Sequence, residues 1–457
     1  MDESKMISSV KQQYEALPYP PRNPEDEKIR LLRTVGDSLS ELNHCCFKGQ
    51  RNFNQNFRCL VAGGGTGDSV INLAEQLRET SAEIVYLDMS AASRRIAEQR
   101  AAARGLNNIT WLTESLLSIP ELDIGQFDYI NCSGVLHHLS DPQEGAHALT
   151  SALKDDGAIY LMLYAEYGRH SIYLFQTLLR EMIPQSMSIP EKVIMARRII
   201  GALPIHHAFI KDLDKWANEI TAAGYGDSGL YDLLLHSVDR CYNVNEVYAL
   251  AAAAELKLVT FLGPNKRFYD PTQLVADQSI RLLWREKSIQ EQQSIAEKLF
   301  SNHIKHQFYL SRQASCTASM DDEDNAIILE HELANQNMAI HDAIKPEETL
   351  SITFTINNEK TVFQLMGNKV NKACFQYMDG KTPISSIIRK VKMKCGASEQ
   401  KIRLELRSIF EDLYPMGCIY LQRHKSYVRP CISVYTLSLK SLRTNFCIIT
   451  KAGSTSL

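Results

Sequence analysis

The sequence predicts an α/β domain with a parallel sheet in residues 57–165, from two observations. Short β-branched runs alternate there with amphipathic helical segments, which is the pattern of a parallel sheet covered by helices on both faces. A glycine-rich stretch, residues 63–67, follows the first run and opens the first helix. The runs predicted as strands are CLVA (59–62), IVYLD (84–88), ITWL (109–112), YINC (129–132) and AIYLML (158–163).

The helices between these strands have recognisable ends. They are predicted to begin near Asp68, Ser90 and Pro142. Ser90 is a good N-cap because a serine hydroxyl accepts a hydrogen bond from a free backbone N–H, and Gly105 is a good stop for the same helix.

A chain of 457 residues is too long for one hydrophobic core, so we expect more than one domain. Helical patterns dominate after the core, an acidic stretch follows, and two strand-like runs then precede three helical patterns and a short strand. The predicted parts are an N-terminal arm (1–55), the α/β core (56–165), a helical cap with closing strands (166–312), an acidic linker (313–349), a small α/β module (350–430) and a tail (431–457).

Composition and charge exclude several classes of protein. A net charge of −3 gives no general argument for binding nucleic acid or an anionic membrane. No run approaches the ~20 apolar residues of a membrane helix, so we expect no membrane span and a cytoplasmic location. The 11 cysteines include no C-x-x-C pair, which predicts reduced thiols and no metal site.

The strongest motif is the glycine loop VAGGGTGD, which spans residues 61–68. Glycines let the backbone turn tightly and approach a ligand that a Cβ atom would repel, and the following helix presents free N–H groups. Asp88 ends the second predicted strand, where a carboxylate can accept hydrogen bonds from ribose hydroxyls. A dinucleotide motif, G-x-G-x-x-G, would need glycine at position 68, which is Asp68. The candidate loop residues are Gly63, Gly64, Gly65, Thr66 and Gly67.

Five ordered motifs make residues 57–165 resemble the class I S-adenosylmethionine (SAM) methyltransferases. They are the loop ending GTG, EIVYLDMS (83–90), WLTESL (111–116), FDYINCSGVLHHLSDP (127–142) and LKDDG (153–157). The resemblance implies a Rossmann-like core of seven strands and SAM as cofactor. It implies further that Met89 packs on the adenine and that Ser115 and Leu116 read its edge. Because ligands of open α/β sheets lie beyond the carboxyl ends of the strands, we expect Ser133 and Gly134, after the fourth strand, near the methyl group. Two positions depart from the family, since Val61 and Ser115 stand where acids are usual.

Candidate acceptor residues fall in three places. His138 follows the fourth strand and is a possible base, although a packing or capping role for His137 and His138 is the simpler alternative. Tyr167 follows the fifth strand. The segment 231–242 crowds titratable groups that could bind or deprotonate an amine, or else form an Asp239–Arg240 ion pair that holds the cap. Its candidates are Asp232, His236 and Asp239.

Residues 8–312 further resemble a bacterial subgroup of methyltransferases that includes protein-lysine methyltransferases. The resemblance rests on QYEALPYP (13–20), YAEYGR (164–169), YDLLLH (231–236) and NHIKHQFY (302–309). It implies a cap domain that shapes the acceptor pocket and can dimerise, and an arm with Tyr14 and Tyr19 folded over the cofactor. The arm tyrosines could equally be simple anchors.

The module 350–430 resembles small winged-helix domains that bind peptides, around YMDGKTPI (377–384). Its residues 381–430 are basic, a pattern that suits nucleic acid, an acidic peptide, the acidic linker of the same chain, or merely a solvated helix surface.

The leading hypothesis is a SAM-dependent N-methyltransferase acting on a protein lysine or a similar amine. A small-molecule methyltransferase, for a quinone or lipid precursor, is the alternative, and a non-catalytic SAM-binding module is a third. An open acidic groove would favour lysine, whereas an aromatic-lined pocket closed by a helical cap would favour the small molecule.

Overall fold

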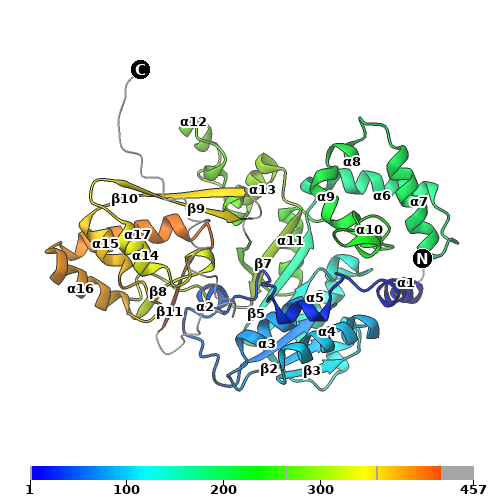
Figure 1. The fold of residues 1–457 in the computed structure, drawn as a ribbon, viewed down its shortest axis with the longest axis horizontal. Helices are drawn as coiled ribbons and strands as arrows, with labels where there is room; N and C mark the ends of the chain where they lie inside the picture. The colour runs from blue at the N-terminus through cyan, green and yellow to red at the C-terminus, as the bar shows by residue number, and fades with distance from the viewer. Residues whose placement is uncertain (1–2, 264, 357–358, 424–457) are drawn as a thin grey trace. The chain divides into compact units, whose positions relative to one another are not determined.

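The computed structural model describes residues 3–263, 265–356 and 359–423, which divide into two compact units (Figure 1). Unit 1 comprises residues 1–37, 56–261 and 268–313. Unit 2 comprises residues 38–55, 262–267 and 314–457. Within the described part of the chain, no helix is long and apolar enough to cross a membrane.

Unit 1 is built on a seven-stranded sheet with the order β3-β2-β1-β4-β5-β7-β6. The first five strands are parallel, and β7 runs antiparallel to both β5 and β6. The predicted seven-stranded, Rossmann-like core and each of its five predicted strands are therefore confirmed. The strands are β1 (Arg58–Ala62), β2 (Glu83–Leu87), β3 (Ile109–Leu112), β4 (Phe127–Ser133), β5 (Leu153–Tyr164), β6 (Lys257–Phe261) and β7 (Lys305–Ser311).

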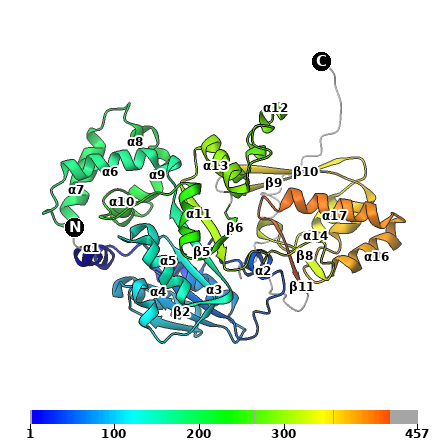
Figure 2. The ribbon, with the colours of Figure 1, turned by 180° about the vertical axis from the view of Figure 1, so that it is seen from behind.

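The helices of this core form two layers. The strand order reverses between β1 and β4, so right-handed connections put α3 and α4 on one face and α5 on the other (Figure 2). As predicted, the Ser90 hydroxyl accepts from the Ser93 N–H at the start of α4, and Gly105 ends that helix with φ 66°. The helices are α3 (Asp68–Gln76), α4 (Ala91–Arg104), α5 (Pro142–Ser151), α11 (Val244–Ala253) and α13 (Ile289–Phe300).

A separate hydrophobic core holds the predicted helical cap together, with Phe175, Phe209 and Trp216 at its centre. The cap is inserted between β5 and β6, so its helices rise from the carboxyl edge of the sheet. They are α6 (His170–Met182), α7 (Ile189–Ala202), α8 (Ala208–Lys211), α9 (Leu213–Ile220) and α10 (Gly226–Leu234).

The remaining short elements of the chain are η2 (Leu116–Glu121), η3 (Leu136–His138), η4 (Tyr167–Arg169), η5 (Lys266–Tyr269), η6 (Pro271–Gln273), α12 (Gln278–Arg281) and η7 (His331–Leu333).

The N-terminal arm is shorter than predicted. It consists of α1 (Glu3–Ala16), η1 (Pro24–Lys28) and the chain up to residue 37. Residues 38–55, with α2 (Leu39–Cys46), belong instead to unit 2, because buried polar groups of α2 bond to its last strand. Glu41 accepts from the Tyr420 hydroxyl at 2.6 Å, and the His44 Nδ1 accepts from the Leu421 N–H at 3.2 Å.

Unit 2 also corrects the prediction of a linker at 313–349. Residues 325–329 form β8, which pairs antiparallel with β11, and Ile327 and Leu329 enter the core of the unit. The continuous acidic run 321–324 ends at Asp324, and the apolar run that follows it provides the buried strand. The elements are β8 (Asn325–Leu329), α14 (Asn337–Ala343), β9 (Thr349–Ile356), β10 (Glu359–Met366), α15 (Lys369–Phe375), α16 (Ile384–Cys395), α17 (Glu399–Leu413) and β11 (Ile419–Arg423).

The predicted pattern of two strands, three helices and a short strand in 350–430 is present, with β9 and β10 forming a hairpin. The comparison with winged-helix domains is not confirmed and stays a prediction. The predicted tail, residues 431–457, lies outside the described residues.

The acidic segment 321–324 contacts arginines of the basic stretch in its own unit. Asp321 pairs with Arg407 at 2.8 Å, and Asp322 pairs with Arg423 at 2.9 Å. Glu323 pairs with Arg403 of α17. Of the partners considered for the basic stretch, this segment of the same chain is the one that the structure supplies.

Helix α17 offers a matched test of the unit 2 core. Leu406 is fully buried, whereas Leu404, on the same helix, is 62% exposed. Leu406→Ala should lower the free energy of unfolding by ~2–5 kcal/mol, because the cavity adds to the lost transfer energy. Leu404→Ala should change it by less than ~0.5 kcal/mol. Denaturant unfolding of the full chain followed by circular dichroism gives both values, and equal values would refute this packing.

Candidate active site

A cavity of about 530 Å³ lies at the carboxyl edge of the parallel strands in unit 1. Ligands of open α/β sheets bind at this edge, where the strand order reverses. Its walls come from the arm, the glycine loop, the ends of β2, β4 and β5, the cap and the start of β7. They include Tyr14, Tyr19, Gly63, Gly64, Gly65, Asp88, Met89, Ser115, Leu116, Ser133, Gly134, His138, Tyr164, Arg169, Trp216, Glu219, Tyr225, Asp232, Lys305 and Gln307.

The glycine loop is packed so tightly that side chains are excluded. A Cβ on Gly63 would lie 2.2 Å from Val135 Cγ2, and a Cβ on Gly64 would lie 2.3 Å from the Tyr86 ring. Gly63 and Gly65 also have positive φ values, 73° and 51°, which glycine adopts readily. The loop therefore exposes bare backbone to the cavity.

Asp88 fastens this loop to the end of β2. Its carboxylate accepts from the Gly65 N–H at 2.7 Å and from the Ser90 N–H at 2.8 Å. Burial raises the pKa of Asp88, while these two backbone bonds oppose the rise. A carboxylate has about four lone-pair sites, so it can still accept from a ligand hydroxyl.

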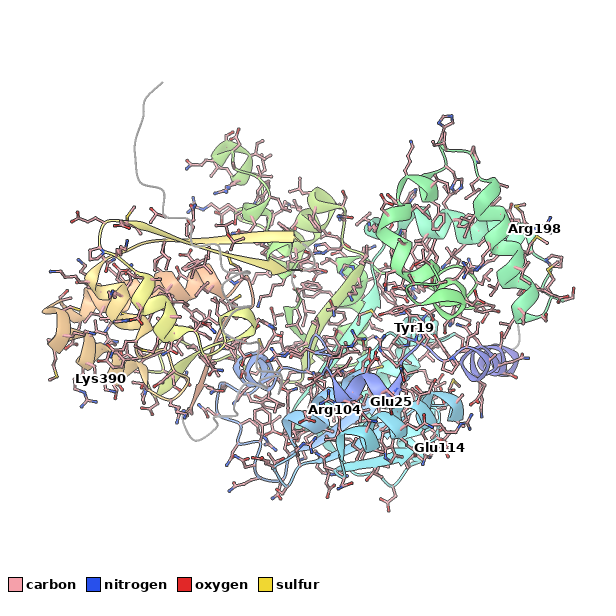
Figure 3. All side chains as sticks on the ribbon, in the orientation of Figure 1. Tyr19, Glu25, Arg104, Glu114, Arg198 and Lys390 are labelled. Atoms are coloured by element: carbon pink, nitrogen blue, oxygen red, sulfur yellow. The ribbon has the colours of Figure 1, made fainter. Side chains whose placement is uncertain are left out.

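The predicted adenine end of the site is also assembled. Met89, Ser115 and Leu116 all line the cavity. The Ser115 hydroxyl accepts from the Leu117 N–H at 3.2 Å, as the N-cap of η2, and keeps its own proton available for a ligand. Glu114, which the sequence reasoning did not select, lines the same region (Figure 3).

These residues fit SAM. The loop backbone can approach a ligand closely, Asp88 can accept from ribose hydroxyls, and the Met89 side chain provides an apolar surface for a base. Thr66 and Gly67 were predicted for the cofactor but do not line the cavity. The Thr66 hydroxyl donates to the Pro20 carbonyl at 2.7 Å, and Gly67 caps α3.

The arm closes the cavity from the cofactor side to the cap. Arg22 donates to Asp68 of α3 at 2.6 Å, and the Tyr19 hydroxyl donates to Glu219 of α9 at 3.0 Å. The arm therefore contacts both the core and the cap of this unit. Figure 3 labels Tyr19 between the cap helices and the core.

Asp232 is the centre of the acceptor end. Its two carboxylate oxygens accept from the Tyr14 hydroxyl at 2.9 Å and the Tyr164 hydroxyl at 3.2 Å. Asp232 is buried, and burial raises its pKa although His138 and Tyr14 act in the opposite direction. The sequence predicted Asp232, but not that its partners would come from the arm and from β5.

His138 and His236 stack with ring centroids 3.7 Å apart. His138 Nδ1 lies 2.7 Å from the Val238 carbonyl, which only accepts, so Nδ1 carries a proton and the lone pair of the neutral ring is on Nε2. His236 Nδ1 accepts from the Val238 N–H at 3.1 Å, and burial lowers the pKa of His236 well below its usual value. His236 is therefore neutral with its proton on Nε2.

These tautomers bear on metal binding. Possible ligand atoms of His138, Asp232 and His236 lie within 4.8 Å of one another, which is the spacing of a metal site. A metal would need a lone pair on His236 Nε2, which carries the proton, and this nitrogen instead lies 3.4 Å from the Tyr14 hydroxyl. The cluster is organised for hydrogen bonding.

The other predicted acceptor residues, His236, Tyr167 and Asp239, do not line the cavity. Tyr167 has its ring 5.8 Å from the Lys298 ammonium. Asp239 accepts from Gln176 at 2.7 Å and lies 3.9 Å from Arg169. The ion-pair alternative holds for Asp239 with a different partner, because Arg240 pairs with Glu246 at 3.2 Å.

Some cavity residues carried no signal in the sequence. Glu219 and Tyr225 lie in ordinary helical patterns of the cap, and Lys305 is the first residue of β7, inside the stretch 302–309 but without a role assigned to it from the sequence. They reach the same cavity as Asp232 only because the cap and β7 both return to this edge of the sheet.

The comparisons with known proteins agree with this geometry. The profile of a family described as "Methyltransferase domain" matches residues 60–159. The chain carries a class I SAM-dependent methyltransferase domain. This methyltransferase domain covers β1 to β5, including the glycine loop and Asp88, so the predicted class and its cofactor are confirmed.

Relatives in sequence match parts of the chain. An uncharacterized protein of Synechococcus is 30% identical over 275 residues, 59% of this chain and 64% of that protein. A ubiquinone biosynthesis O-methyltransferase of Salmonella paratyphi A is 26% identical over 115 residues, 24% of this chain and 47% of that enzyme. The chain therefore spans less than two thirds of these curated relatives.

A relative in structure extends beyond the methyltransferase domain. PKMT2 from Rickettsia typhi, solved in complex with AdoHcy, superposes with a TM-score of 0.59 over 89% of this chain and 77% of PKMT2. The two sequences are 15% identical, so this likeness is one of fold.

Asp37 ties the end of the arm to β4 beneath the cavity. It is fully buried and accepts from Asn131 Nδ2 at 2.8 Å and the Tyr129 hydroxyl at 3.0 Å. Burial is the main cause that raises the pKa of Asp37 to about 6, although its hydrogen bonds act in the opposite direction.

Gly64→Ala should weaken binding of S-adenosylhomocysteine by at least about tenfold, or ~1.4 kcal/mol, because the new Cβ must displace the loop or the Tyr86 ring. Isothermal titration calorimetry gives the affinities. Gly201→Ala on α7 is the control, since a Cβ there meets nothing within 4 Å. Unchanged affinity in the Gly64 variant would show that the loop is not the binding surface.

The raised pKa of Asp37 makes stability depend on pH. The folded state holds this proton more tightly than the unfolded chain, whose Asp has a pKa near 3.8. The stabilisation that the proton provides is therefore complete below pH ~4 and lost as pH rises to about 6. Asp37→Asn should remove this dependence in thermal unfolding, whereas Asp214→Asn on the exposed side of α9 should keep it. A wild-type melting temperature that rises relative to Asp37→Asn between these pH values would contradict the assignment.

Proposed function

We propose that this chain transfers a methyl group from SAM to an amine nitrogen, with a protein lysine side chain as the leading acceptor. The observation that carries the proposal is the buried Asp232 carboxylate, which two tyrosine hydroxyls hold at the acceptor end of the cavity. A buried carboxylate beside aromatic rings suits an ammonium group, which it attracts by charge while the rings add cation–π contact.

Bound SAM supplies an electrophilic methyl group on a sulfonium, and the protein must orient the acceptor and take up its proton. The loop backbone, Asp88, Met89, Ser115 and Leu116 would hold the cofactor. Asp232 binds the acceptor ammonium, with Tyr14 and Tyr164 fixing the carboxylate. His138 then accepts the ammonium proton at Nε2, because the Val238 carbonyl keeps the other ring proton on Nδ1.

The fold of PKMT2, a protein lysine methyltransferase, supports the lysine class, since it resembles this chain well beyond the methyltransferase domain. The enclosed aromatic wall favours a second candidate. Tyr14, Tyr19, Tyr164, Trp216 and Tyr225 surround the acceptor end, as expected for a small molecule. Curated relatives such as the ubiquinone biosynthesis enzyme act in small-molecule pathways and agree with this candidate.

The proposal also covers the cellular compartment of the enzyme and its oligomeric state. The nine described cysteines are free thiols, which supports a reducing compartment such as the cytoplasm. Leu174, Met182 and Ile194 are apolar and about half exposed on α6 and α7, which supports a homodimer through the cap.

One experiment separates the acceptor classes. The purified chain is incubated with methyl-labelled SAM and a cell extract, and protein is then separated from small molecules. Label on lysine in the protein fraction supports the proposal, whereas label only among small molecules overturns the lysine class. No label in either fraction, with SAM still bound, identifies a non-catalytic module.

Substitutions of His138 and Asp232 should change different kinetic constants. His138→Asn should lower kcat by ~10²–10⁴-fold, because it removes the base but keeps a group that can donate to Val238. Asp232→Asn should mainly raise KM for the amine, by ~10- to 100-fold, as a charge-assisted bond worth ~1.5–3 kcal/mol is lost. Steady-state kinetics with S-adenosylhomocysteine binding as the fold check give both values. Asp227→Asn, at an exposed acid of the same helix, is the control, and full activity of both site variants would exclude this mechanism.

A further inference from the structure

Lys305 is a titratable cavity residue that the mechanism above does not use. It begins β7 and lines the cavity with its side chain. Lys305 is exposed at the start of β7, and none of the described residues accepts a hydrogen bond from its ammonium group. The other long cation at this end, Arg169, is buried against the Tyr164 ring with its guanidinium 3.6 Å from the ring centre.

The register of the sheet places Lys305 relative to the end of β4. Ser133 pairs with Met162 of β5, and Met162 pairs with Gln307 of β7. Tyr164 and Lys305 form the next pair on the same face, two residues farther toward the carboxyl edge. Two strand residues span only about 6.6 Å, a length that the flexible four-carbon stem of a lysine can cover.

Gly134 follows β4 at the level of Met162, where its N–H donates to the Met162 carbonyl at 3.2 Å. The lysine stem can therefore turn back over Met162 toward Ser133 and Gly134, the positions predicted to lie near the transferred methyl group. Tyr164, the cross-strand partner of Lys305, also donates to Asp232. Lys305 thus shares the acceptor end with the carboxylate assigned to the substrate.

We propose that Lys305 is itself a methyl acceptor of this active site, so that the chain methylates its own ε-amine when no other acceptor fills the cavity. This inference rests on the proposed function. It adds a modification site, because the enclosed amine competes with an incoming lysine for the same methyl group.

The chemistry balances with groups of this cavity. The Lys305 ammonium gives a proton to the Glu219 carboxylate, the nearby acid that acts on it electrostatically. The amine nitrogen then forms a bond to the methyl carbon of SAM as the carbon–sulfur bond breaks, and that electron pair stays on sulfur. The products are a methylammonium on Lys305 and a neutral thioether. Burial lowers the pKa of Lys305 and raises the pKa of Glu219, and both shifts ease this proton transfer.

The test uses the purified full-length chain, SAM and no other acceptor. We expect intact-mass spectra to gain one or more methyl groups and chymotryptic mapping to place them on Lys305. Lys305→Arg should lose this incorporation, whereas Lys257→Arg, at an exposed lysine of β6, should keep it. The rate per molecule should not depend on protein concentration, because the acceptor is in the same chain. Methyl groups only on other lysines, or a rate proportional to concentration, overturn the inference.

A second readout does not depend on methyl transfer. Acetic anhydride should acetylate Lys305 in the cofactor-free protein and so block its later methylation, and a Lys305 that resists acetylation overturns the inference. Binding of S-adenosylhomocysteine confirms that Lys305→Arg is folded, and Lys305→Gln serves as a second variant. If an extract protein is methylated while Lys305 stays unmodified, only this inference fails. If no acceptor at all is methylated, the proposed function fails with it.

Discussion

The hydrogen bond between Asp88 and the Gly65 N–H is the contact on which the rest of the site depends. It joins the ends of the first two parallel strands and holds the glycine loop in a backbone conformation that side chains cannot share. The same carboxylate bonds to Ser90, the N-cap of α4, and so sets the start of that helix. Cofactor surface, loop and helix start are therefore placed together by one buried charge.

The arm makes cofactor and acceptor regions parts of one enclosed space. Thr66 and Asp68 bind it on the core side through Pro20 and Arg22. Tyr14, from the same arm, holds Asp232 on the cap side. Because the arm supplies a wall to both regions, its position affects cofactor and acceptor alike.

In unit 2 the charged side chains form ion pairs within the unit, whereas those of unit 1 described above build the site. Its acidic segment neutralises arginines of α17 and β11 within the unit, through pairs that remain partly exposed. Such pairs are individually weak and are screened by salt, so the apolar core around β8, α16 and α17 provides the main stabilisation. The basic composition of this region therefore reflects, at least in these three arginines, an internal arrangement.

The sequence alone determined the core, because the glycine loop, Asp88 and the strand alternation are local patterns with one physical explanation each. The resemblance of its motifs to those of SAM methyltransferases also predicted Met89, Ser115 and Leu116 at the cofactor, and all three line the cavity. Local patterns could not show that residues 38–55 belong to unit 2, or that 325–329 form a strand, because both depend on pairing with β11 far along the chain. The acceptor end was likewise decided only by tertiary structure. Tyr14, Glu219, Asp232 and Lys305 come from four separate segments, and their proximity follows from how the arm, the cap and β7 return to the sheet edge.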